Sequence, residues 1–382
     1  MLPRGAAAAP PRRVADWLHR ASDPPFRVPL DYVGLHSDHG LGKAVPAPTY
    51  AYDATRAIDV DDGIDMPATQ WSLIEREPGS YDWRAVEAWI KAHPGKTRIW
   101  VLFGTPTFHQ KYPGEPWRYP YLPGGGSPPR DPAAAARFIR SLLDRFPGQI
   151  RFIEVCNEPN FGYGPGASAG RWTKAMGRPG FFTGTPEDLA ALSRSVRAVL
   201  PKGVELMAGA WEGQSEGGSP LNSLLRFSRA SDGAGGFGRD HVDALSVHSY
   251  TYHHDPNKMI AELRGYRQRF AEAGYRPGLA AYVTEAGAEA PGTWSATHPP
   301  LADKVRIMKR WLLIPAALGY SGTYLYKHSI MPTLGDPARE PALGAAITAM
   351  RDALRGRLLV EAARLIDDSI WLSFADGTTV EA

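Results

Sequence analysis

Two glutamates stand at the ends of short apolar stretches, where strands deliver reactive groups. Glu158 follows the run IRFIEVCN at 150–157 and lies between an asparagine and a proline. Glu285 follows the run AAYVT at 280–284 in the same way, and Gly287 lets the chain turn away two residues later. Hydrolysis of a glycosidic bond needs two carboxyl groups, one as proton donor and one as nucleophile or base. The two glutamates are therefore the first candidates for a catalytic pair.

The elements that must position this pair alternate between strand and helix from residue 31 to about residue 355. This order is typical of βα units around a parallel sheet. The strand candidates are 31–36, 53–58, 97–104, 150–157, 204–210, 242–250, 280–285 and 322–328. Helices are expected to begin at Asp131-Pro132 and at Thr185-Pro186, where a capping residue precedes proline, and to cover 84–93, 219–230, 256–273, 302–317 and 340–355. The segment HGLGKAVPAPTYAY at 39–52 has two prolines and no helical period, so a loop is expected to replace the first crossover helix.

Eight such strands predict the α/β fold class, as a (β/α)8 TIM barrel with a small β appendage formed by the chain termini. The barrel is expected to span 31–355. Residues 356–382 alternate in polarity and contain the turn signal Ala-Asp-Gly-Thr at 375–378, which predicts the appendage. Residues 1–30 are expected to form an arm that is partly disordered or packed on the appendage. Glu158 and Glu285 would end the fourth and seventh strands and converge at the mouth of the barrel.

Composition narrows the classes of function. With 43 Lys and Arg against 40 Asp and Glu, and no basic run interleaved with aromatics, the chain shows no nucleic-acid footprint. Its single cysteine, Cys156, excludes an internal disulfide and a cysteine-based zinc site. No apolar run approaches the length of about 18 residues that a membrane span needs, and no cofactor is expected. The Ala-, Pro- and Arg-rich start at 1–13 is interpreted either as the remnant of a removed signal, in a secreted or periplasmic protein, or as the arm of a cytoplasmic one.

Several motifs together resemble one group of enzymes. The stretch FIEVCNEPN, followed by the helix GTPEDLAALSRSVRAVL, resembles the acid/base strand and next helix of clan A glycoside hydrolases, most of all glycoside hydrolase family 39 and its relatives. The segment WSLIEREPGSYDW at 71–83 and the FGTP at 103–106 resemble two further motifs of that family. The resemblance covers roughly residues 31 to 330.

This resemblance implies a mechanism and a carbohydrate as the partner. Glu158 would be the general acid/base and Glu285 the nucleophile that forms a covalent glycosyl intermediate. Asn157 would hydrogen-bond the 2-hydroxyl of the sugar. The anomeric configuration would be retained, with the two carboxyl groups about 5 to 5.5 Å apart.

Other candidates for substrate binding lie near strand ends. Tyr250 is expected to donate to Glu285, and Arg56 to neutralise charge beside it. Trp211 and Trp294 are expected to stack on sugar faces. The full set of substrate-binding candidates is Asn157, His36, Arg56, His248, Tyr250, Tyr326, Trp211 and Trp294.

The chain departs from the family pattern at Cys156 and Ala286, where tryptophan is common, and at Ile58, where an aromatic is common. Smaller side chains are expected to open or reshape the sugar site. On this ground, and because the appendage is short, an endo-acting enzyme on a bacterial exopolysaccharide is favoured. An exo-acting β-xylosidase or another exo-glycosidase is the alternative.

Two other classes of protein are alternative interpretations of the sequence. A metal-dependent hydrolase would use ligands from the set His36, Asp38, His39, His253, His254 and Asp255. The cluster lacks an H-E-x-x-H spacing, so no metal is expected. A non-catalytic carbohydrate-binding barrel is the other alternative, and the presence of both glutamates argues against it.

Overall fold

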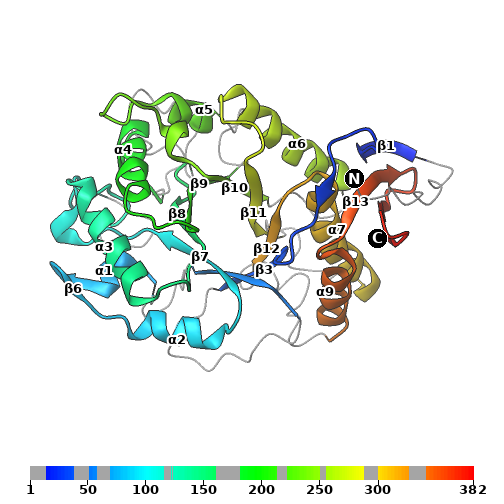
Figure 1. Ribbon diagram of the computed structural model, residues 1–382, viewed down its shortest axis with the longest axis horizontal. Helices are drawn as coiled ribbons and strands as arrows, with labels where there is room; N and C mark the ends of the chain where they lie inside the picture. Colours follow the sequence, from blue (N-terminus) through cyan, green and yellow to red (C-terminus); the bar gives the residue numbers. More distant parts are fainter. Residues whose placement is uncertain are drawn as a thin grey trace.

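In the computed structural model, eight parallel strands close into a barrel with helices outside it (Figure 1). The structure describes residues 14–37, 51–57, 69–115, 122, 124–160, 181–212, 222–249, 255–287, 300–326 and 341–382. The barrel strands in chain order are β3 (Val33–Ser37), β4 (Ala54–Ala57), β7 (Thr97–Leu102), β8 (Phe152–Asn157), β9 (Glu205–Glu212), β10 (Ala244–Ser249), β11 (Ala280–Ala286) and β12 (Gly322–Tyr326). Each coincides with a predicted strand, and β12 pairs with β3 to close the ring. The predicted TIM barrel is confirmed.

Most of the helices also follow the prediction. They are α1 (Trp71–Ile74), α2 (Arg84–Ala92), α3 (Pro132–Arg145), α4 (Pro186–Arg197), α5 (Asn222–Arg229), α6 (Pro256–Glu272), α7 (Leu301–Ala317) and α9 (Pro341–Leu354), with 3-10 turns η1 (Thr107–His109) and η2 (Gly238–His241). At α4 the predicted capping box is present, since Thr185 and Asp188 each accept the other's backbone N–H. The turn α1 and the hairpin of β5 (Glu75–Glu77) and β6 (Ser80–Tyr81) were not predicted. The expected first crossover loop lies largely outside the described residues.

The two ends of the chain form one antiparallel sheet on the flank of the barrel. It contains β1 (Val14–His19), β2 (Phe26–Arg27), β13 (Leu358–Leu365), β14 (Ile370–Phe374) and β15 (Thr379–Glu381), and β13 pairs with β1, β2 and β14. In Figure 1, the blue β1 lies beside the red β13. The sheet packs on α7, one of the outer helices. The predicted hairpin at 375–378 joins β14 to β15, because Phe374 N donates to Thr378 O.

The interior of the barrel is layered. Its apolar layer is formed by Ala54, Ile99, Phe152, Met207, Ala244, Tyr282 and Tyr324. Two residues further along their strands lie four buried polar side chains, Arg56, Glu154, Ser246 and Thr284. Because side chains alternate along a strand, a step of two residues keeps the same face and moves one layer towards the carboxyl ends. A polar layer therefore separates the apolar core from the mouth.

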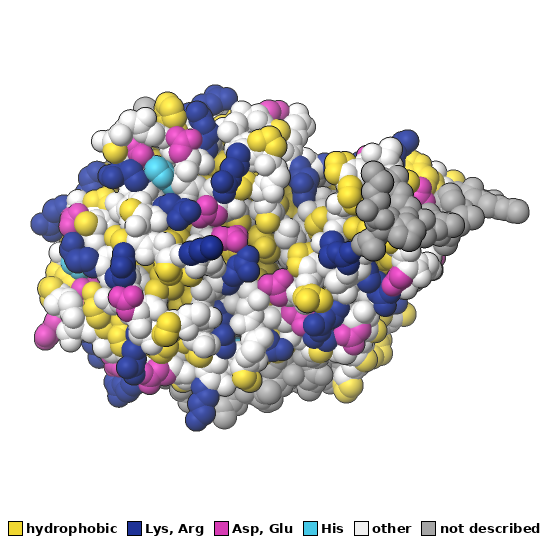
Figure 2. Space-filling model, in the orientation of Figure 1, with side chains coloured by type: hydrophobic (Ala, Val, Ile, Leu, Met, Phe, Trp, Pro, Cys, Tyr) yellow, Lys and Arg dark blue, Asp and Glu magenta, His cyan; other side chains and the backbone are white. Residues whose placement is uncertain are grey.

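Two observations concern the outside of the molecule. Figure 2 shows Lys, Arg, Asp and Glu interspersed over the described part of the face that it displays, without a broad patch of one sign. Among the helices of the described residues, none combines the length and apolar character needed to cross a membrane. The prediction of no spanning segment agrees with this finding.

The close packing of the barrel interior can be tested at Gly34 on β3. A Cβ atom there would lie 2.3 Å from Cδ1 of the buried Tyr324 ring. We expect Gly34→Ala to lower the free energy of unfolding by about 1–3 kcal/mol, because the buried ring must shift to make room for the methyl group. Urea unfolding measures the change.

The matched control is Gly265→Ala in α6, where an added Cβ would meet nothing within 4 Å. This change should stabilise the protein by about 0.5–1 kcal/mol, since glycine weakens a helix interior. Equal stability of the two variants would contradict the layered packing described above.

Candidate active site

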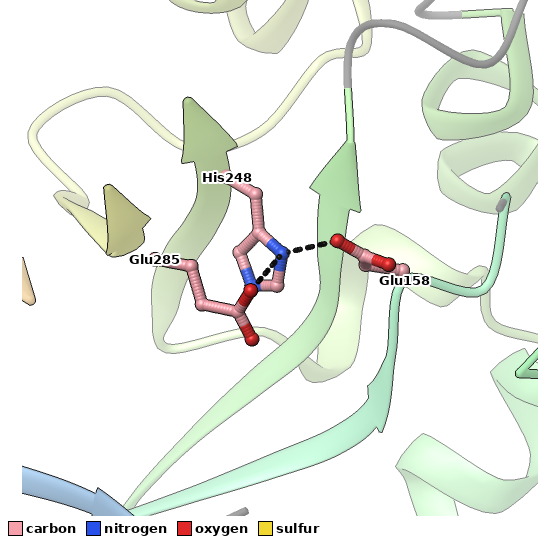
Figure 3. A group of neighbouring side chains, drawn as sticks. All are labelled: Glu158, His248 and Glu285. Carbon is pink, nitrogen blue, oxygen red and sulfur yellow. Dashed lines mark hydrogen bonds and ion pairs between the residues drawn. The ribbon is translucent and has the colours of Figure 1, made fainter. Parts of the chain in front are cut away.

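Glu158, His248 and Glu285 meet at the carboxyl edge of the barrel. Glu158 directly follows β8, His248 lies on β10 and Glu285 on β11, so the two glutamates end the fourth and seventh strands. All three residues are at most 6% exposed. Figure 3 shows His248 between the two carboxylates, with Nδ1 2.7 Å from Oε1 of Glu158 and 3.3 Å from Oε2 of Glu285. One oxygen of each glutamate and the histidine nitrogen lie within 4.8 Å of one another.

A bulge in β11 turns Glu285 towards this site. Val247 of β10 pairs with Val283, but the next residue, His248, pairs with Glu285, so β11 contains one extra residue. Thr284 and Glu285 therefore both face inward. Thr284 Oγ1 lies 2.6 Å from Ser246 Oγ, while Glu285 reaches Arg56. A regular strand would have sent one of the two neighbours outward.

At the end of β8, the alternation of inward and outward side chains is also interrupted. Glu154 and Asn157 both bond to Arg56, although residues three apart on a regular strand face opposite sides. Between them, Cys156 has φ 70°, and Glu158 follows with φ 36°. Non-glycine residues in this region cost about 1–3 kcal/mol each and persist where the surroundings hold them. The strain lies at the candidate catalytic residue itself.

On the neighbouring strand, Gly209 makes room for this conformation. Its φ is 71°, and a Cβ there would lie 2.9 Å from the Trp211 ring and 3.1 Å from Cγ of Pro159. Pro159 directly follows Glu158. Only glycine allows Trp211 and Pro159 to come this close to the backbone of β9.

Arg56 joins the parts of the site from below. Its Nη1 donates to Oε1 of Glu285 at 2.5 Å, its Nη2 to Oδ1 of Asn157 at 2.7 Å, and both Nε and Nη2 donate to Glu154. The side chain is fully buried. Burial by itself disfavours the charge, but the carboxylates of Glu154 and then Glu285 outweigh it, so the pKa of Arg56 is raised. The guanidinium is a permanent cation beside Glu285.

Glu154 was not singled out from the sequence. It is 0% exposed, and its Oε2 accepts from Ser246 Oγ at 2.8 Å. A signal was available, because Glu154 is the one charged residue inside the apolar segment FIEVCN, and a buried carboxylate needs a partner. Tyr266 on α6 was also missed. Its hydroxyl lies 3.2 Å from the carbonyl oxygens of both Trp211 and His248, which share its single proton, and it connects α6 to the ends of β9 and β10.

Some sequence predictions need correction. Trp211 is 1% exposed and packs on Phe227 in the hydrophobic core, so it presents no face to a sugar. Cys156 and Ala286 also belong to this core, and the idea that their small size opens the sugar site is wrong. Burial, followed by the charges of Glu154 and Glu158, raises the pKa of the Cys156 thiol well above its usual range. The thiol stays protonated and is no nucleophile.

The other predicted positions divide into three groups. Asn157, Arg56 and His248 are brought together with the two glutamates, as described above. Tyr250, Trp294 and the departure at Ile58 lie outside the described residues. His36 and Tyr326 lie on β3 and β12, where their backbones pair, and their side chains are outside what the structure describes.

The same three donors raise the question of a metal. Two carboxylates and one imidazole within 4.8 Å form a set that a divalent cation such as Zn²⁺ accepts. Arg56, however, already places a buried cation on Oε1 of Glu285, and a second cation there would be repelled. Of the metal ligands considered from the sequence, Asp255 caps α6 by accepting from Asn257 N. Asp38, His39, His253, His254 and the side chain of His36 lie outside the described residues.

The fold of this chain is similar to that of several solved structures. No family model and no curated protein matches the chain by sequence. Among solved structures, the chain is similar to a glucosidase from Croceicoccus marinus, with a TM-score of 0.57, 14% identity, and 93% of this chain and 77% of that chain covered. A family 39 glycoside hydrolase from Bacteroides cellulosilyticus gives a TM-score of 0.57 at 17% identity, covering 92% of this chain and 69% of that one.

A third similar structure is the family 39 enzyme from Xanthomonas axonopodis pv. citri, with a TM-score of 0.56, 16% identity, and 95% and 75% of the two chains covered. At these identities the similarity is one of fold. The chain has the barrel fold of clan A glycoside hydrolases, with family 39 enzymes among its structural neighbours. The resemblance read from the sequence is confirmed at this level.

The dependence of the site on Arg56 leads to a prediction about stability. Arg56→Met leaves Glu154 and Glu285 buried without their cation. We expect the free energy of unfolding to fall by about 3–5 kcal/mol, measured by urea unfolding at neutral pH.

The control is Arg84→Met, which removes a guanidinium from a pair with Asp82 whose arginine side chain is 87% exposed. It should leave the unfolding midpoint nearly unchanged, because water screens such a pair. A wild-type midpoint for Arg56→Met would show that the carboxylates do not depend on this arginine.

Proposed function

We propose that this protein is a retaining glycosidase that cleaves β-glycosidic bonds by double displacement. The observation that carries the proposal is the carboxylate pair at the mouth of the barrel, with an oxygen of Glu158 and one of Glu285 within 4.8 Å. Retaining enzymes hold their two carboxyl groups about 5–5.5 Å apart, whereas inverting enzymes leave about 6.5–9.5 Å for a water molecule. An oxygen-to-oxygen distance of no more than 4.8 Å fits the shorter of these two ranges. The shared fold with glycoside hydrolases agrees with the reaction class.

The surroundings of the two glutamates support different roles for them. The guanidinium of Arg56 donates to Glu285, which favours the ionised form that a nucleophile needs. Glu158 lies with Oε1 2.7 Å from Nδ1 of His248, and it is 6% exposed. Burial beside another carboxylate favours its protonated form. Glu285 is thus proposed as the nucleophile and Glu158 as the acid/base.

The reaction then takes two steps. Glu158 donates its proton to the glycosidic oxygen while Glu285 attacks the anomeric carbon and forms the glycosyl–enzyme bond. Glu158, now a carboxylate, removes a proton from water, which attacks the same carbon and releases Glu285. Asn157 Oδ1 is held by Arg56, so its amide nitrogen is left to donate to the 2-hydroxyl of the sugar. That bond would strengthen at the transition state.

Substitution of each glutamate tests the roles. Glu285→Ala is expected to lower kcat/KM at least about 10³-fold, and Glu158→Ala about 10²- to 10⁴-fold on a substrate with a poor leaving group. On a substrate whose leaving group departs without protonation, azide should restore turnover in both variants. The glycosyl azide should have inverted configuration with Glu285→Ala and retained configuration with Glu158→Ala, because only the second variant keeps the nucleophile.

Product configuration by NMR gives the readout, with Cys156→Ser as a control for damage to β8. The opposite pattern of azide products would exchange the two roles. Full activity of both variants, or stoichiometric metal whose removal abolishes turnover, would instead favour a different hydrolytic mechanism.

For the substrate, we propose internal cleavage of a bacterial exopolysaccharide. Support comes from the position of the appendage, which packs on α7 at the flank of the barrel and not across the carboxyl ends of the strands among the described residues. Cys156 and Ala286 lie in the core and lend no support to this mode of action. An exo-acting β-xylosidase or glucosidase is the alternative. The structural similarity to the glucosidase from Croceicoccus marinus supports this alternative.

A substrate panel separates these two modes of action. Bacterial exopolysaccharides should fall in viscosity well before reducing ends accumulate in proportion, because internal cuts shorten chains quickly. Aryl β-xylosides and β-glucosides, assayed in parallel, should be turned over slowly or not at all. Turnover of an aryl glycoside alone, with release of single sugars, would contradict the endo proposal. Glu285→Ala serves as the inactive control for every substrate.

A further inference from the structure

Glu154 is a buried carboxylate that the proposed mechanism does not use. It lies on β8 in the polar layer below the two catalytic candidates and is 0% exposed. We propose that Glu154 is a positioning residue, a fixed negative charge that orients Arg56 and offsets its positive charge, so that Glu285 stays an electron-rich nucleophile. This inference rests on the proposed function. It adds a residue that sets how the activity depends on pH.

The contacts of Arg56 show how Glu154 orients it. Oε1 of Glu154 accepts from both Nε, at 3.1 Å, and Nη2 of the guanidinium. Since the guanidinium is planar, these two bonds fix its rotation. Nη1 is then directed at Glu285, and the second proton of Nη2 at Asn157. Without Glu154, the guanidinium of Arg56 would lose the two hydrogen bonds that fix its rotation, and it could turn towards Glu285 alone.

The other oxygen of Glu154 reaches the same catalytic residue by a second route. Oε2 accepts from Ser246 Oγ at 2.8 Å, and Ser246 Oγ lies 2.6 Å from Thr284 Oγ1. Thr284 immediately precedes Glu285 in the bulge of β11. One carboxylate thus supports the arginine that touches Glu285 and the backbone that carries it.

The balance of charge gives Glu154 its electrostatic role. Arg56 on β4 contacts Glu154 directly, and the charge of Glu154 also acts on Cys156 at the end of β8 and on Tyr324 on β12. Glu285 on β11 shares Arg56 with Glu154, and His248 on β10 lies between Glu285 and Glu158. The Cys156 thiol and the Tyr324 hydroxyl stay neutral, because burial first and nearby charges second raise their pKa values.

Arg56 therefore serves two carboxylates with one positive charge. With Glu154 ionised, the Arg56–Glu154 pair is neutral, and the negative charge of Glu285 is only partly offset. That charge also helps the neighbouring Glu158 to keep its proton.

The decisive variant is Glu154→Gln, which keeps the shape and removes the charge. Loss of a nearby negative charge favours the ionised form of the remaining carboxyl groups. Both limbs of the bell-shaped profile of kcat/KM against pH should therefore move to lower pH, by about one unit, and the maximum should fall about tenfold or more. A lower maximum with both limbs unmoved would mean that Glu154 only supports the fold, and would overturn the inference.

Three controls separate charge from packing. Glu154→Asp keeps the charge and should leave both limbs where the wild type has them. Ser246→Ala removes the bond to Oε2 without a change of charge, and its limbs should also stay. Glu205→Gln on β9 makes the same chemical change in a partly exposed pair with Arg151 and should affect neither activity nor the limbs. A shift in any of these controls equal to that of Glu154→Gln would also count against the inference.

A measurement without substrate tests the inference independently. Protein labelled with δ-¹³C glutamate is titrated by NMR, and the signals of Glu154, Glu158 and Glu285 are assigned from their absence in Glu154→Asp, Glu158→Gln and Glu285→Gln. In Glu154→Gln, the midpoints of Glu158 and Glu285 should move to lower pH.

The outcomes distinguish this inference from the proposed function. If no glycoside is hydrolysed but the NMR midpoints move, the proposed function fails and the electrostatic role of Glu154 holds. If glycosides are hydrolysed but neither the limbs nor the midpoints move, the role of Glu154 fails and the function holds. Should Glu154→Gln not fold, Glu154→Met removes the same charge with a side chain of similar size, and unmoved midpoints of Glu158 and Glu285 in that variant would overturn the role of Glu154.

Discussion

The site depends on a single positive charge enclosed by the barrel. Arg56 has no exposed surface, so its charge is sustained by Glu154 and Glu285, and its hydrogen bonds reach β8 and β11 from β4. In a low-dielectric interior such a group is stable only when its partners keep good geometry. The same requirement that stabilises the buried charge therefore holds three strands in the register that the carboxylate pair needs.

The site also requires irregular backbone at the ends of two strands. Regular strands present every other side chain to the interior, but this site takes consecutive residues, Thr284 with Glu285 and Asn157 with Glu158. A bulge in β11 and positive φ at Cys156 and Glu158 provide the change of phase. The core packing of Cys156 and Trp211 behind these strand ends opposes relaxation of the strained segment. Residues with no contact to a sugar thereby shape the site.

The two glutamates are alike in burial and differ in their neighbours. A guanidinium touches Glu285, and a histidine lies between it and Glu158 (Figure 3). Under the proposed function, this asymmetry would let identical side chains take the roles of nucleophile and acid, because environment decides which carboxyl keeps a proton. It also weighs against a metal at the same place, where Arg56 already supplies a cation.

The sequence by itself determined the eight strands, most of the helices, the hairpin at 375–378 and the candidate pair Glu158 and Glu285. These follow from local signals, namely apolar runs, caps and turn residues, which act over a few neighbours. Tertiary structure alone decided which side chains face one another. Trp211 points into the core, and Glu154 joins Arg56 across 98 positions of chain. Bulges and buried ion pairs arise from contacts between distant strands, so periodicity along one strand does not encode them.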